Sequence, residues 1–397
     1  MTPLHLAHHT VTCCAGDGLA PLGAALRAGS SGLRPYHIEG LGMDTWIGEV
    51  SGLGETPVPA PFSEYDCRNN RLALRGLAAD GFEDAVRARI ARHGPRRVGV
   101  VLGTSTSGIL STELAYRQRG PDGGPLPASL VYHGSHGTYS LAGFVRAWLG
   151  LEGPASVVST ACSSSAKVFA AAARLIHANL VDAVLVGGVD SLCFTTLHGF
   201  ASLELTSPEP CRPYDAERRG ISIGEAAAFA LLERPPASLD ANALLLLGHG
   251  ESSDAYHMSS PHPEGLGARL AMEGALAQAG LAPGDIDYIN LHGTATVNND
   301  AAEGCAVAGL FGNRVPASST KGLTGHTLGA AGAVEVSVCA LALAEGLLPG
   351  SAHTRVVDPS IPINYLLAPR PAPLRRAMSN SFGFGGSNCS VIIGRAG

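Results

Sequence analysis

The 397-residue sequence has few charged residues and no basic run. Asp, Glu, Lys and Arg make up 15% of it, against 45% hydrophobic residues, and the formal net charge is −6. Adjacent arginines occur only as isolated pairs such as Arg96–Arg97, whereas nucleic-acid binding requires clustered Lys and Arg. The composition argues against a nucleic-acid partner. It favours a large core with little exposed surface per residue, which an oligomer would reduce further.

Long apolar runs are also missing. No uninterrupted apolar stretch reaches the ~18 residues that a membrane span needs. The first residues, MTPLHLAHHTVTCC, have neither a basic start nor a long apolar segment, so the sequence predicts no signal peptide. We expect no membrane association.

The cysteines do not form a disulfide or zinc pattern. There are nine of them, an odd number, and none forms a CxxC pair. The histidine pairs His8–His9, His133/His136 and His257/His262 lack Cys or carboxylate partners at ligand spacing. The sequence therefore predicts no metal site, mostly buried thiols and a reducing, cytoplasmic location.

Short apolar runs alternate with Ala-rich helical stretches along the chain. Residues 98–103, 156–162, 182–191, 226–233, 243–250, 285–293 and 388–394 read as strands, and residues 163–180, 265–281 and 331–348 as helices. This alternation predicts an α/β fold with a mixed or parallel sheet. The Pro-rich segment 233–243 is the best internal boundary, dividing the chain into residues 1–238 and 239–397.

Cys162 is the candidate nucleophile. In SVVSTACSSSAKVF it lies where a predicted strand gives way to a helix, among small residues. A thiol at a helix N-terminus is favoured as thiolate by unpaired backbone N–H groups and by the helix dipole. The segment by itself is equally compatible with a buried structural cysteine in a Ser-rich turn.

Two histidines lie in glycine-containing turns. His292 begins HGTAT, where the hydroxyls of Thr294 and Thr296 follow at alternate positions. His326 follows Lys321 in STKGLTGHTLGAAG and precedes a predicted helix that contains Glu335. A buried Lys and Glu need pairing, so Lys321 and Glu335 form a plausible ion pair. A structural turn histidine, a loop lysine and a solvated glutamate remain the alternatives.

A glycine-rich segment, NSFGFGGSNCSVII, precedes the last predicted strand. It does not open a helix, so it is not a dinucleotide-binding loop. Its glycines permit a flexible loop or a close backbone approach, and Phe382 and Phe384 could gate a pocket there. An ordinary hairpin turn is the alternative.

Taken together and in this order, TACSSS, HGTAT, STKGLTGH and NSFGFGGSN resemble the β-ketoacyl-acyl carrier protein synthases, the elongating condensing enzymes of fatty acid and polyketide synthesis. The resemblance covers nearly the whole chain, including GVVLGTSTSG (99–108) and GGVDS (187–191). It implies the thiolase fold, in which two similar halves form five layers, α-β-α-β-α. It also implies an acyltransferase that forms a homodimer or pairs with a related subunit.

The resemblance implies a role for each motif residue. Cys162 would accept an acyl chain from a carrier-protein thioester, and neutral His292 and His326 would bind the malonyl thioester carbonyl as CO₂ leaves. The oxyanion hole would be the backbone N–H groups of Cys162 and Phe384. Lys321 paired with Glu335 would balance charge, Thr294 and Thr296 would bind the phosphopantetheine arm, and Phe384 would gate the site beside Phe382. No cofactor is implied beyond the phosphopantetheine of the acyl carrier protein.

The sequence departs from the family pattern at a few positions. Ala295 replaces the usual Gly of HGTGT, adding a methyl group beside the expected pantetheine channel, and Ser387-Asn388-Cys389 replaces Thr-Asn-Ala. Thr106 lies where relatives carry residues that shape the acyl pocket, and Phe200 is expected to line that pocket too. A polar Thr106 suggests an unusual acyl chain and slightly favours a specialised pathway.

Two other classes remain open. A non-catalytic partner subunit resembling chain-length factors would lack the nucleophile, whereas Cys162, His292, His326 and Lys321 are all present. A thiolase-like acyltransferase without decarboxylation would need a second cysteine as base, and Cys389 is the candidate, although its neighbours do not match. Release of CO₂ from malonyl carrier protein separates the condensing enzyme from both.

Overall fold

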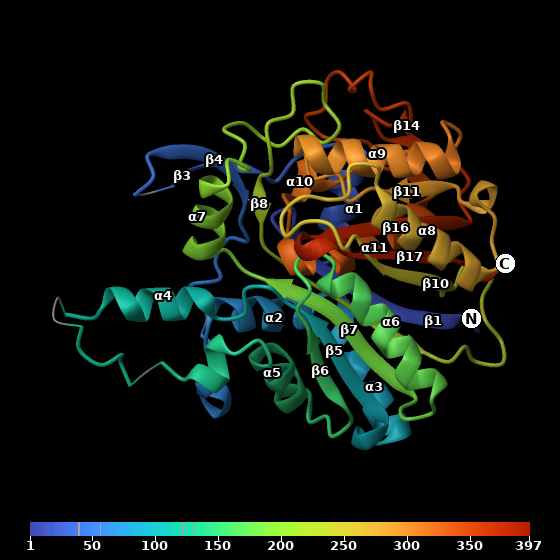
Figure 1. Cartoon of the computed structure of the whole chain (residues 1–397). Helices are drawn as coiled ribbons and strands as arrows, with labels where there is room; N and C mark the ends of the chain where they lie inside the picture. The colour runs from blue at the N-terminus through green and yellow to red at the C-terminus, as the bar shows by residue number, and fades with distance from the viewer. Residues whose placement is uncertain (39, 56, 121–122, 129) are drawn as a thin grey trace.

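Strands and helices alternate along the chain in the computed structural model, which describes residues 1–38, 40–55, 57–120, 123–128 and 130–397 (Figure 1). Two expected strands have the predicted bounds, as β5 (Val98–Gly103) and β9 (Ala226–Glu233). Every residue of both strands is buried. Such continuous burial is typical of strands covered on both faces by helices.

The strands of the first half form a mixed sheet in the order β6-β5-β7-β9-β1. Besides β5 and β9, they are β1 (Leu4–Cys13), β6 (Ala155–Val158) and β7 (Ala183–Asp190). β6 and β7 run parallel to β5, whereas β9 runs antiparallel to both of its neighbours.

The strands of the second half repeat this arrangement in the order β12-β11-β16-β17-β10. They are β10 (Leu244–Ser253), β11 (Tyr288–Asn290), β12 (Pro316–Ser318), β16 (Arg376–Gly383) and β17 (Ser387–Arg395). β12 and β16 run parallel to β11, and β17 runs antiparallel to both of its neighbours. When the five strands named for each half are counted in chain order, both halves pair the third, second, fourth, fifth and first. The short β14 (Asn364–Tyr365) adds an edge strand beside β12. The halves meet where the start of β1 pairs with β10.

Helices separate and cover the two halves of the sheet. The central layer contains α6 (Ser164–His177) and α11 (Ala331–Glu345), which contact each other and strands of both halves. The outer face of the first half packs against α2 (Arg68–Ala78), α3 (Phe82–His93) and α5 (Ser140–Leu149). The outer face of the second half packs against α8 (Leu266–Ala279) and α9 (Val297–Phe311). This gives the five layers expected from the resemblance.

Helix α11 is apolar on all sides because it lies between the two sheets. Together with the preceding turn, Leu328–Glu345 is long and apolar enough to cross a membrane, but 83% of that window is buried inside the structure. A helix buried on every face in a core has the same composition. The apolar sequence of α11 is therefore explained by its place in the central layer.

The N-terminal segment forms the strand β1, which the sequence pattern did not predict. β1 lies in the middle of the continuous sheet, between β9 and β10. Its three histidines at positions 5, 8 and 9 are only partly buried, while Leu4, Leu6 and Val11 belong to the central core. The histidines mask the apolar pattern that identifies a buried strand.

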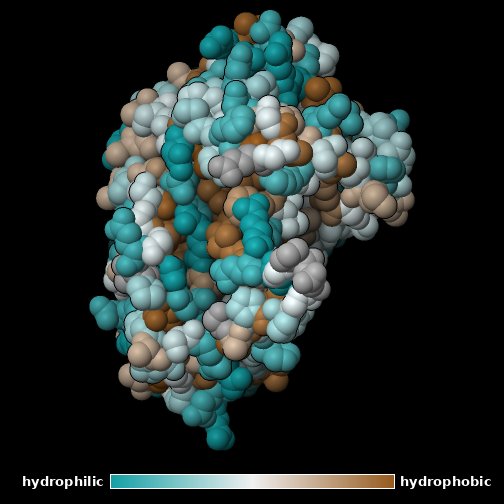
Figure 2. All heavy atoms as spheres, turned by 90° about the vertical axis from the view of Figure 1, so that its left-hand side faces the viewer, coloured by the Kyte–Doolittle hydropathy of each residue, from teal (hydrophilic) through white to brown (hydrophobic). Residues whose placement is uncertain are grey.

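Smaller elements lie outside these five layers. β3 (Arg34–Ile38), β4 (Met43–Gly48) and β8 (Ile223–Gly224) form a separate three-stranded sheet next to α7 (Phe194–Ser202). Helix α4 (Ile109–Arg117) projects from the body (Figure 1). Figure 2 shows the face from which it projects, where apolar side chains gather near the middle among polar ones.

Candidate active site

Cys162 lies in a tight turn between a strand and a helix. The strand expected to reach residue 162 ends at Val158, and α6 begins at Ser164, so the predicted strand was four residues too long. Ala161 adopts a left-handed backbone with φ of 52°. The Ser164 hydroxyl accepts from the Thr160 N–H at 2.9 Å and donates to the Ala161 carbonyl at 2.5 Å. Ser164, two residues after the cysteine, thus closes the strained turn that presents the thiol.

Glycines on three neighbouring elements let the start of α6 come very close. A Cβ at Gly103 of β5 would lie 2.5 Å from the Ser165 nitrogen, and one at Gly188 of β7 would lie 2.5 Å from the Ser165 Cβ. A Cβ at Gly332 of α11 would lie 2.5 Å from the Ala166 nitrogen. Larger side chains would push the nucleophile turn away from its neighbours. The small residues around Cys162 are therefore a packing requirement.

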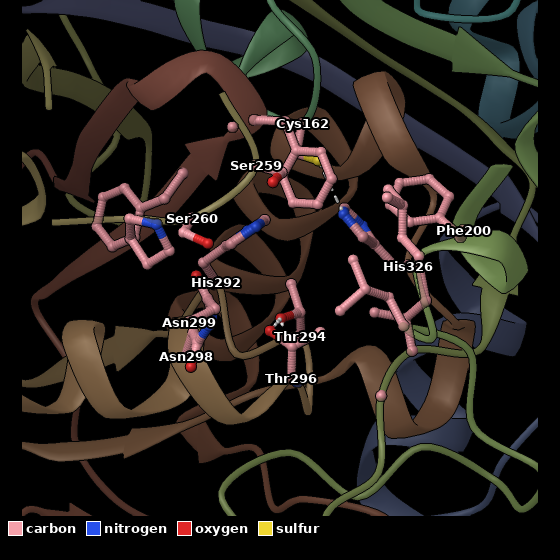
Figure 3. Close-up of a pocket in the computed structure, with 18 of the residues that line it drawn as sticks. Cys162, Phe200, Ser259, Ser260, His292, Thr294, Thr296, Asn298, Asn299 and His326 are labelled. Atoms are coloured by element: carbon pink, nitrogen blue, oxygen red, sulfur yellow. Dashed lines mark hydrogen bonds between the residues drawn. The ribbon is translucent and has the colours of Figure 1, made fainter. Parts of the chain in front are cut away.

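Both motif histidines lie beside Cys162. The His326 Nε2 is 3.0 Å from the Cys162 Sγ, although the two residues are 164 positions apart. The His292 ring is edge-on to that of His326, with 5.3 Å between their centroids. Figure 3 shows the three side chains converging on one cavity, with Phe200 on the side of His326. This is the arrangement of a thiol next to a base, with a second imidazole facing the same space.

Lys321 and Glu335 form the ion pair expected from the sequence. Both side chains are almost completely buried, and the Lys321 ammonium donates to the Glu335 carboxylate and to the His292 carbonyl. Its third contact is the His292 Nδ1, at 3.3 Å. Since an ammonium group can only donate, His292 Nδ1 accepts and the ring proton belongs on Nε2.

Burial and one cation set the protonation states at the site. Burial, then the charge of Lys321, holds the pKa of both His292 and His326 well below the ordinary value of 6.5. Burial raises the pKa of Cys162 to about 11, although Lys321 and the Phe384 N–H both act to lower it. The resting site near pH 7 therefore holds two neutral imidazoles and a thiol. His326 is placed to accept the thiol proton during attack.

The site opens into a cavity of about 490 Å³. Phe200 of α7, Phe382 of β16 and Phe384 in the glycine-rich turn line it together with Cys162 and both histidines. The rings of Phe200 and Phe384 lie 5.6 Å apart, and that of Phe382 lies 6.0 Å from His292. The Phe384 N–H points at the Cys162 Sγ. These positions fit a ring gate and an oxyanion donor at the nucleophile.

The structure brings Thr294 and Thr296 into the cavity but not Thr106. The threonine hydroxyls of HGTAT are 2.9 Å apart and line the cavity with Asn298 and Asn299 (Figure 3). Thr106 is not among the lining residues, because its buried hydroxyl donates to Asp190. The expected contact between Thr106 and an acyl chain in this cavity is therefore not found.

The methyl group of Ala295 also points away from the channel. Ala295 is fully buried, packs with Leu33 and Cys211, and has a left-handed φ of 66°. The expectation that its methyl group lies beside the pantetheine channel was wrong. This residue fills a small core, in a backbone conformation where glycine is the unstrained choice.

Glu303 on α9 is a site residue that sequence reasoning missed. Its carboxylate accepts from the His292 and Gly293 N–H groups, both at 2.8 Å, and from the Asn380 side chain at 3.2 Å. Burial raises the pKa of Glu303 to about 7. A single glutamate in an alanine-rich helix reads as a solvated residue, so no sequence signal marked it. It fixes the backbone of the HGTAT turn.

A second missed group joins the glycine-rich turn to the loop after β10. Asp254 accepts from the Asn388 side chain at 2.9 Å, and its own N–H donates to the Gly386 carbonyl at 2.9 Å. The Gly385 N–H donates to the Met258 carbonyl at 2.8 Å. Asp254, Asn388 and both glycines line the cavity. The turn that holds Phe384 is therefore tied to a neighbouring loop.

The catalytic set also has the spacing of a metal site. One ligand atom each from Cys162, His292 and His326 lies within 4.8 Å of the others. The sequence predicted no metal site, and these three residues are far apart in it. The Lys321 ammonium against His292 Nδ1 disfavours a second cation here, and the neutral thiol is not yet the thiolate that binds metals.

Fold and site together define a class: a thiolase-fold enzyme in which a cysteine nucleophile and two neutral histidines share one cavity. Two family models match the chain, the β-ketoacyl synthase N-terminal domain over residues 70–237 and the β-ketoacyl synthase C-terminal domain over residues 244–355. The chain belongs to the β-ketoacyl synthase family.

Similar proteins agree with this assignment. A 3-oxoacyl-[acyl-carrier-protein] synthase 2 from Vibrio cholerae is 32% identical over 94% of both chains. A nodulation protein E from Rhizobium leguminosarum is 33% identical over 96% of both. A solved structure of a ketosynthase in complex with its chain length factor from Xenorhabdus doucetiae is 39% identical with a TM-score of 0.91, covering 100% of this chain and 98% of that one. The protein is a condensing enzyme of the acyltransferase class, acting in fatty acid or polyketide synthesis.

Proposed function

We propose that the protein condenses an acyl chain bound to Cys162 with malonyl-acyl carrier protein, giving 3-oxoacyl-acyl carrier protein, CO₂ and free carrier. In the first step the Cys162 sulfur attacks the thioester carbonyl of an acyl carrier protein. His326 Nε2, at 3.0 Å, takes the thiol proton. The N–H groups of Phe384 and Cys162 stabilise the negative oxygen. His326 then returns the proton to the sulfur of the carrier, which leaves as its thiol and leaves the imidazole neutral.

In the second step the two histidines promote decarboxylation. Because Lys321 occupies His292 Nδ1, the His292 Nε2–H donates toward the malonyl thioester carbonyl. His326, which is neutral again after the first step, donates to the same oxygen once its single ring proton lies on Nε2. As the carboxylate leaves as CO₂, its electron pair forms an enolate whose charge these donors stabilise. No strong base is needed, since loss of CO₂ creates the carbanion.

In the third step the carbanion attacks the Cys162 thioester. The new carbon–carbon bond forms, the carbon–sulfur bond breaks, and Cys162 regains its proton. Thr294 and Thr296 bind the phosphopantetheine arm along the cavity, while Phe200 lines the space for the acyl chain. We propose that this arm is the only prosthetic group involved, and that no metal takes part.

The observation that carries the proposal is the contact of His326 with Cys162 inside a cavity that also contains His292. Its test is to incubate the purified protein with malonyl carrier protein and a panel of acyl carrier proteins, in the presence of EDTA. Intact-protein mass spectrometry follows acyl transfer, and CO₂ release and the 3-oxoacyl product are measured in parallel. We expect all three signals, and the panel reports the preferred chain.

The two alternatives predict other results. A non-catalytic subunit resembling chain-length factors would gain no acyl mass from any carrier. A thiolase-like acyltransferase would gain an acyl mass without releasing CO₂, and it would need Cys389 as base. Cys389 belongs to the central core and does not line the cavity, which supports the condensing reaction.

The pH dependence of decarboxylation tests the neutral state of the histidines. Because the pKa of both is lowered, the imidazoles stay neutral above their folded-state pKa and charge only in more acidic solution. We expect CO₂ release from malonyl carrier protein to vary by less than about twofold between pH 6 and 8. A rate that instead halves near pH 6.5 would show an ordinary histidine at the site. Malonyl carrier protein held at each pH without enzyme is the control.

We further propose an acyl carrier protein and a second subunit as partners, either a copy of this chain or a related subunit. A relative named for its acyl carrier protein substrate and a structural neighbour solved with a chain length factor support this. Helix α4 and residues 130–139 after it expose apolar side chains, namely Leu114, Tyr116, Tyr132 and Tyr139. A second subunit would cover this apolar surface.

The division of the chain into two halves and its cellular location are part of the same proposal. The chain divides into residues 1–238, which contain the nucleophile, and residues 239–397, which contain both catalytic histidines. The repeated strand order supports this division. A cytoplasmic location is supported by the cysteines, all nine of which are free thiols.

A further inference from the structure

Asp190, the last residue of β7, is a buried carboxylate that the mechanism above does not use. It is 0% exposed. Its Oδ1 accepts from the Thr104 hydroxyl at 2.7 Å, from the Ser105 N–H at 2.7 Å, and from both the N–H and the hydroxyl of Thr106 at 2.9 Å. Its Oδ2 accepts from the Gly329 N–H at 2.5 Å. The donors described around this buried carboxylate are all neutral. Each hydrogen bond therefore helps to offset the cost of burying the charge.

The two oxygens connect different parts of the site. Oδ1 binds the turn after β5, whereas Oδ2 binds the segment that follows His326. The backbone of His326 itself is fixed from the other side, because its N–H donates to Ser222 at 2.7 Å and its carbonyl accepts from Gly224 at 2.9 Å. The segment 222–224 thus holds the backbone of His326 itself, and Asp190 holds the chain three residues further on, at Gly329.

Between these two anchors the backbone is strained. Leu328 has a left-handed φ of 50°, which is rare for a residue with a branched side chain. Such a conformation persists only where its surroundings hold it. The hydrogen bond from Gly329 to Asp190 is the first anchor after the strained residue.

We propose that Asp190 is a positioning residue for the condensation: through Gly329 it holds the Thr327–Gly329 turn, and so keeps His326 Nε2 at 3.0 Å from Cys162 Sγ. The inference rests on the proposed roles of Cys162 and His326. In this role the Asp190 carboxylate fixes the position of the base, His326.

A direct electrostatic role for Asp190 is opposed by the sign of its charge. The negative carboxylate raises the pKa of Cys162, which disfavours the thiolate. Removing the charge would therefore make the thiol more reactive if charge were its function. A carboxylate is nevertheless present, and it supplies two acceptor oxygens facing two different turns.

Asp190→Asn separates the two oxygens. The four donors around Oδ1 orient the amide so that its oxygen replaces Oδ1 and its NH₂ group faces the Gly329 N–H, which then has no acceptor. We expect kcat for condensation to fall between about tenfold and a hundredfold, because a small displacement of a catalytic group has effects of this size. KM for both carrier substrates should change by less than about twofold, since the cavity mouth is untouched.

Thr104→Val is the matched control. It removes one donor to Oδ1, and the acceptor of the Ser107 N–H, at nearly constant shape. It leaves the bond from Gly329 to Oδ2 intact. We expect Thr104→Val to lower the melting temperature about as much as Asp190→Asn does. Its kcat should stay within about twofold of the wild type. Equal losses of kcat in the two variants, or an unchanged kcat in Asp190→Asn, would overturn the inference.

Gly329→Ala tests the same contact from the other side and is available if Asp190→Asn does not fold. Its new Cβ would lie 2.7 Å from both Asp190 Oδ2 and the Ser105 hydroxyl, so the turn must move away. The same loss of kcat at constant KM is expected, and a wild-type kcat would contradict the inference. Wild-type protein measured in parallel separates the hypotheses: if it neither becomes acylated nor forms product, the proposed function itself fails.

Discussion

Cys162→Ala is expected to abolish acyl transfer to the protein and to lower condensation by roughly 10⁴-fold or more, while CO₂ release from malonyl carrier protein continues. Acylation needs a nucleophile at the position where His326 Nε2 lies 3.0 Å away and the Phe384 N–H points at the sulfur. Alanine offers none. Intact-protein mass spectrometry checks the missing acyl group, and a CO₂ assay checks the second half of the prediction.

Decarboxylation should survive because its groups do not depend on the sulfur. His292 is oriented by Lys321, and its backbone is held by Glu303. His326 is held on both sides of its backbone. The enolate that forms in the variant has no acyl thioester to attack, so it takes a proton and the product is acetyl carrier protein.

Cys389→Ala is the control for this experiment, because Cys389 is a fully buried thiol in the central core. This variant should lose some stability but still be acylated. If Cys162→Ala still gained an acyl group, another residue would be the nucleophile. If it also stopped releasing CO₂, the two histidines would not act independently of the sulfur.

Lys321→Met is expected to have the second largest effect. Among the described residues Lys321 is the one donor to His292 Nδ1, so its loss no longer fixes the ring proton on Nε2. The change also removes the cation that helps to keep both imidazoles neutral. We expect the decarboxylation rate to fall by about 10²-fold, similar to the loss of an oxyanion donor. CO₂ release at saturating malonyl carrier protein measures it.

The same change should reduce stability in a pH-dependent way. Glu335 is left buried without its partner, and breaking a buried pair costs about 3–5 kcal/mol. The pKa of Glu335 is already raised to about 7 by burial and would rise further without Lys321. A raised folded-state pKa means that the protonated side chain is tolerated, so the variant should lose stability as pH rises through that pKa. Thermal melting between pH 6 and 9 tests this.

The double variant Lys321→Met/Glu335→Gln separates stability from catalysis. It contains neither buried charge, so its melting temperature should recover and lose its pH dependence. Its decarboxylation rate should stay low, because methionine cannot donate to His292 Nδ1. Recovery of the rate together with stability would mean that Lys321 acts only through the fold.

The sequence identified the reacting groups because their motifs are local. TACSSS, HGTAT, TGH and the FGFGG turn each contain a functional residue next to glycine or hydroxyl residues that shape its turn, and the structure shows why. Ser164 closes the turn around Cys162, and glycines admit the start of α6. The pairing of Lys321 with Glu335 was also expected, because two buried charges in neighbouring segments must neutralise each other.

The residues that hold the backbone of these turns could not be identified from local sequence. Glu303 is an ordinary acidic residue in the middle of a helix. Asp190, at the end of a strand, lies in the GGVDS segment that resembles the family, but nothing in that segment indicates its partners. Their roles come from which backbone N–H groups the fold places against them. The expectation for Ala295 failed for the same reason, since its side chain packs into the protein interior. Thr106 lies outside the cavity, with its hydroxyl on Asp190.

By itself the sequence determined the α/β class, the family and the set of candidate reacting side chains, because these depend on residue types and short spacings. Only the tertiary structure decided the distance of 3.0 Å between Cys162 and His326, the tautomer of His292 and the neutral state of both imidazoles. Those properties arise where the ends of strands from two halves of the chain meet across a buried cavity. They depend on burial and on partners from other segments, 29 residues apart for Lys321 and His292 and 164 for Cys162 and His326, which no local pattern contains.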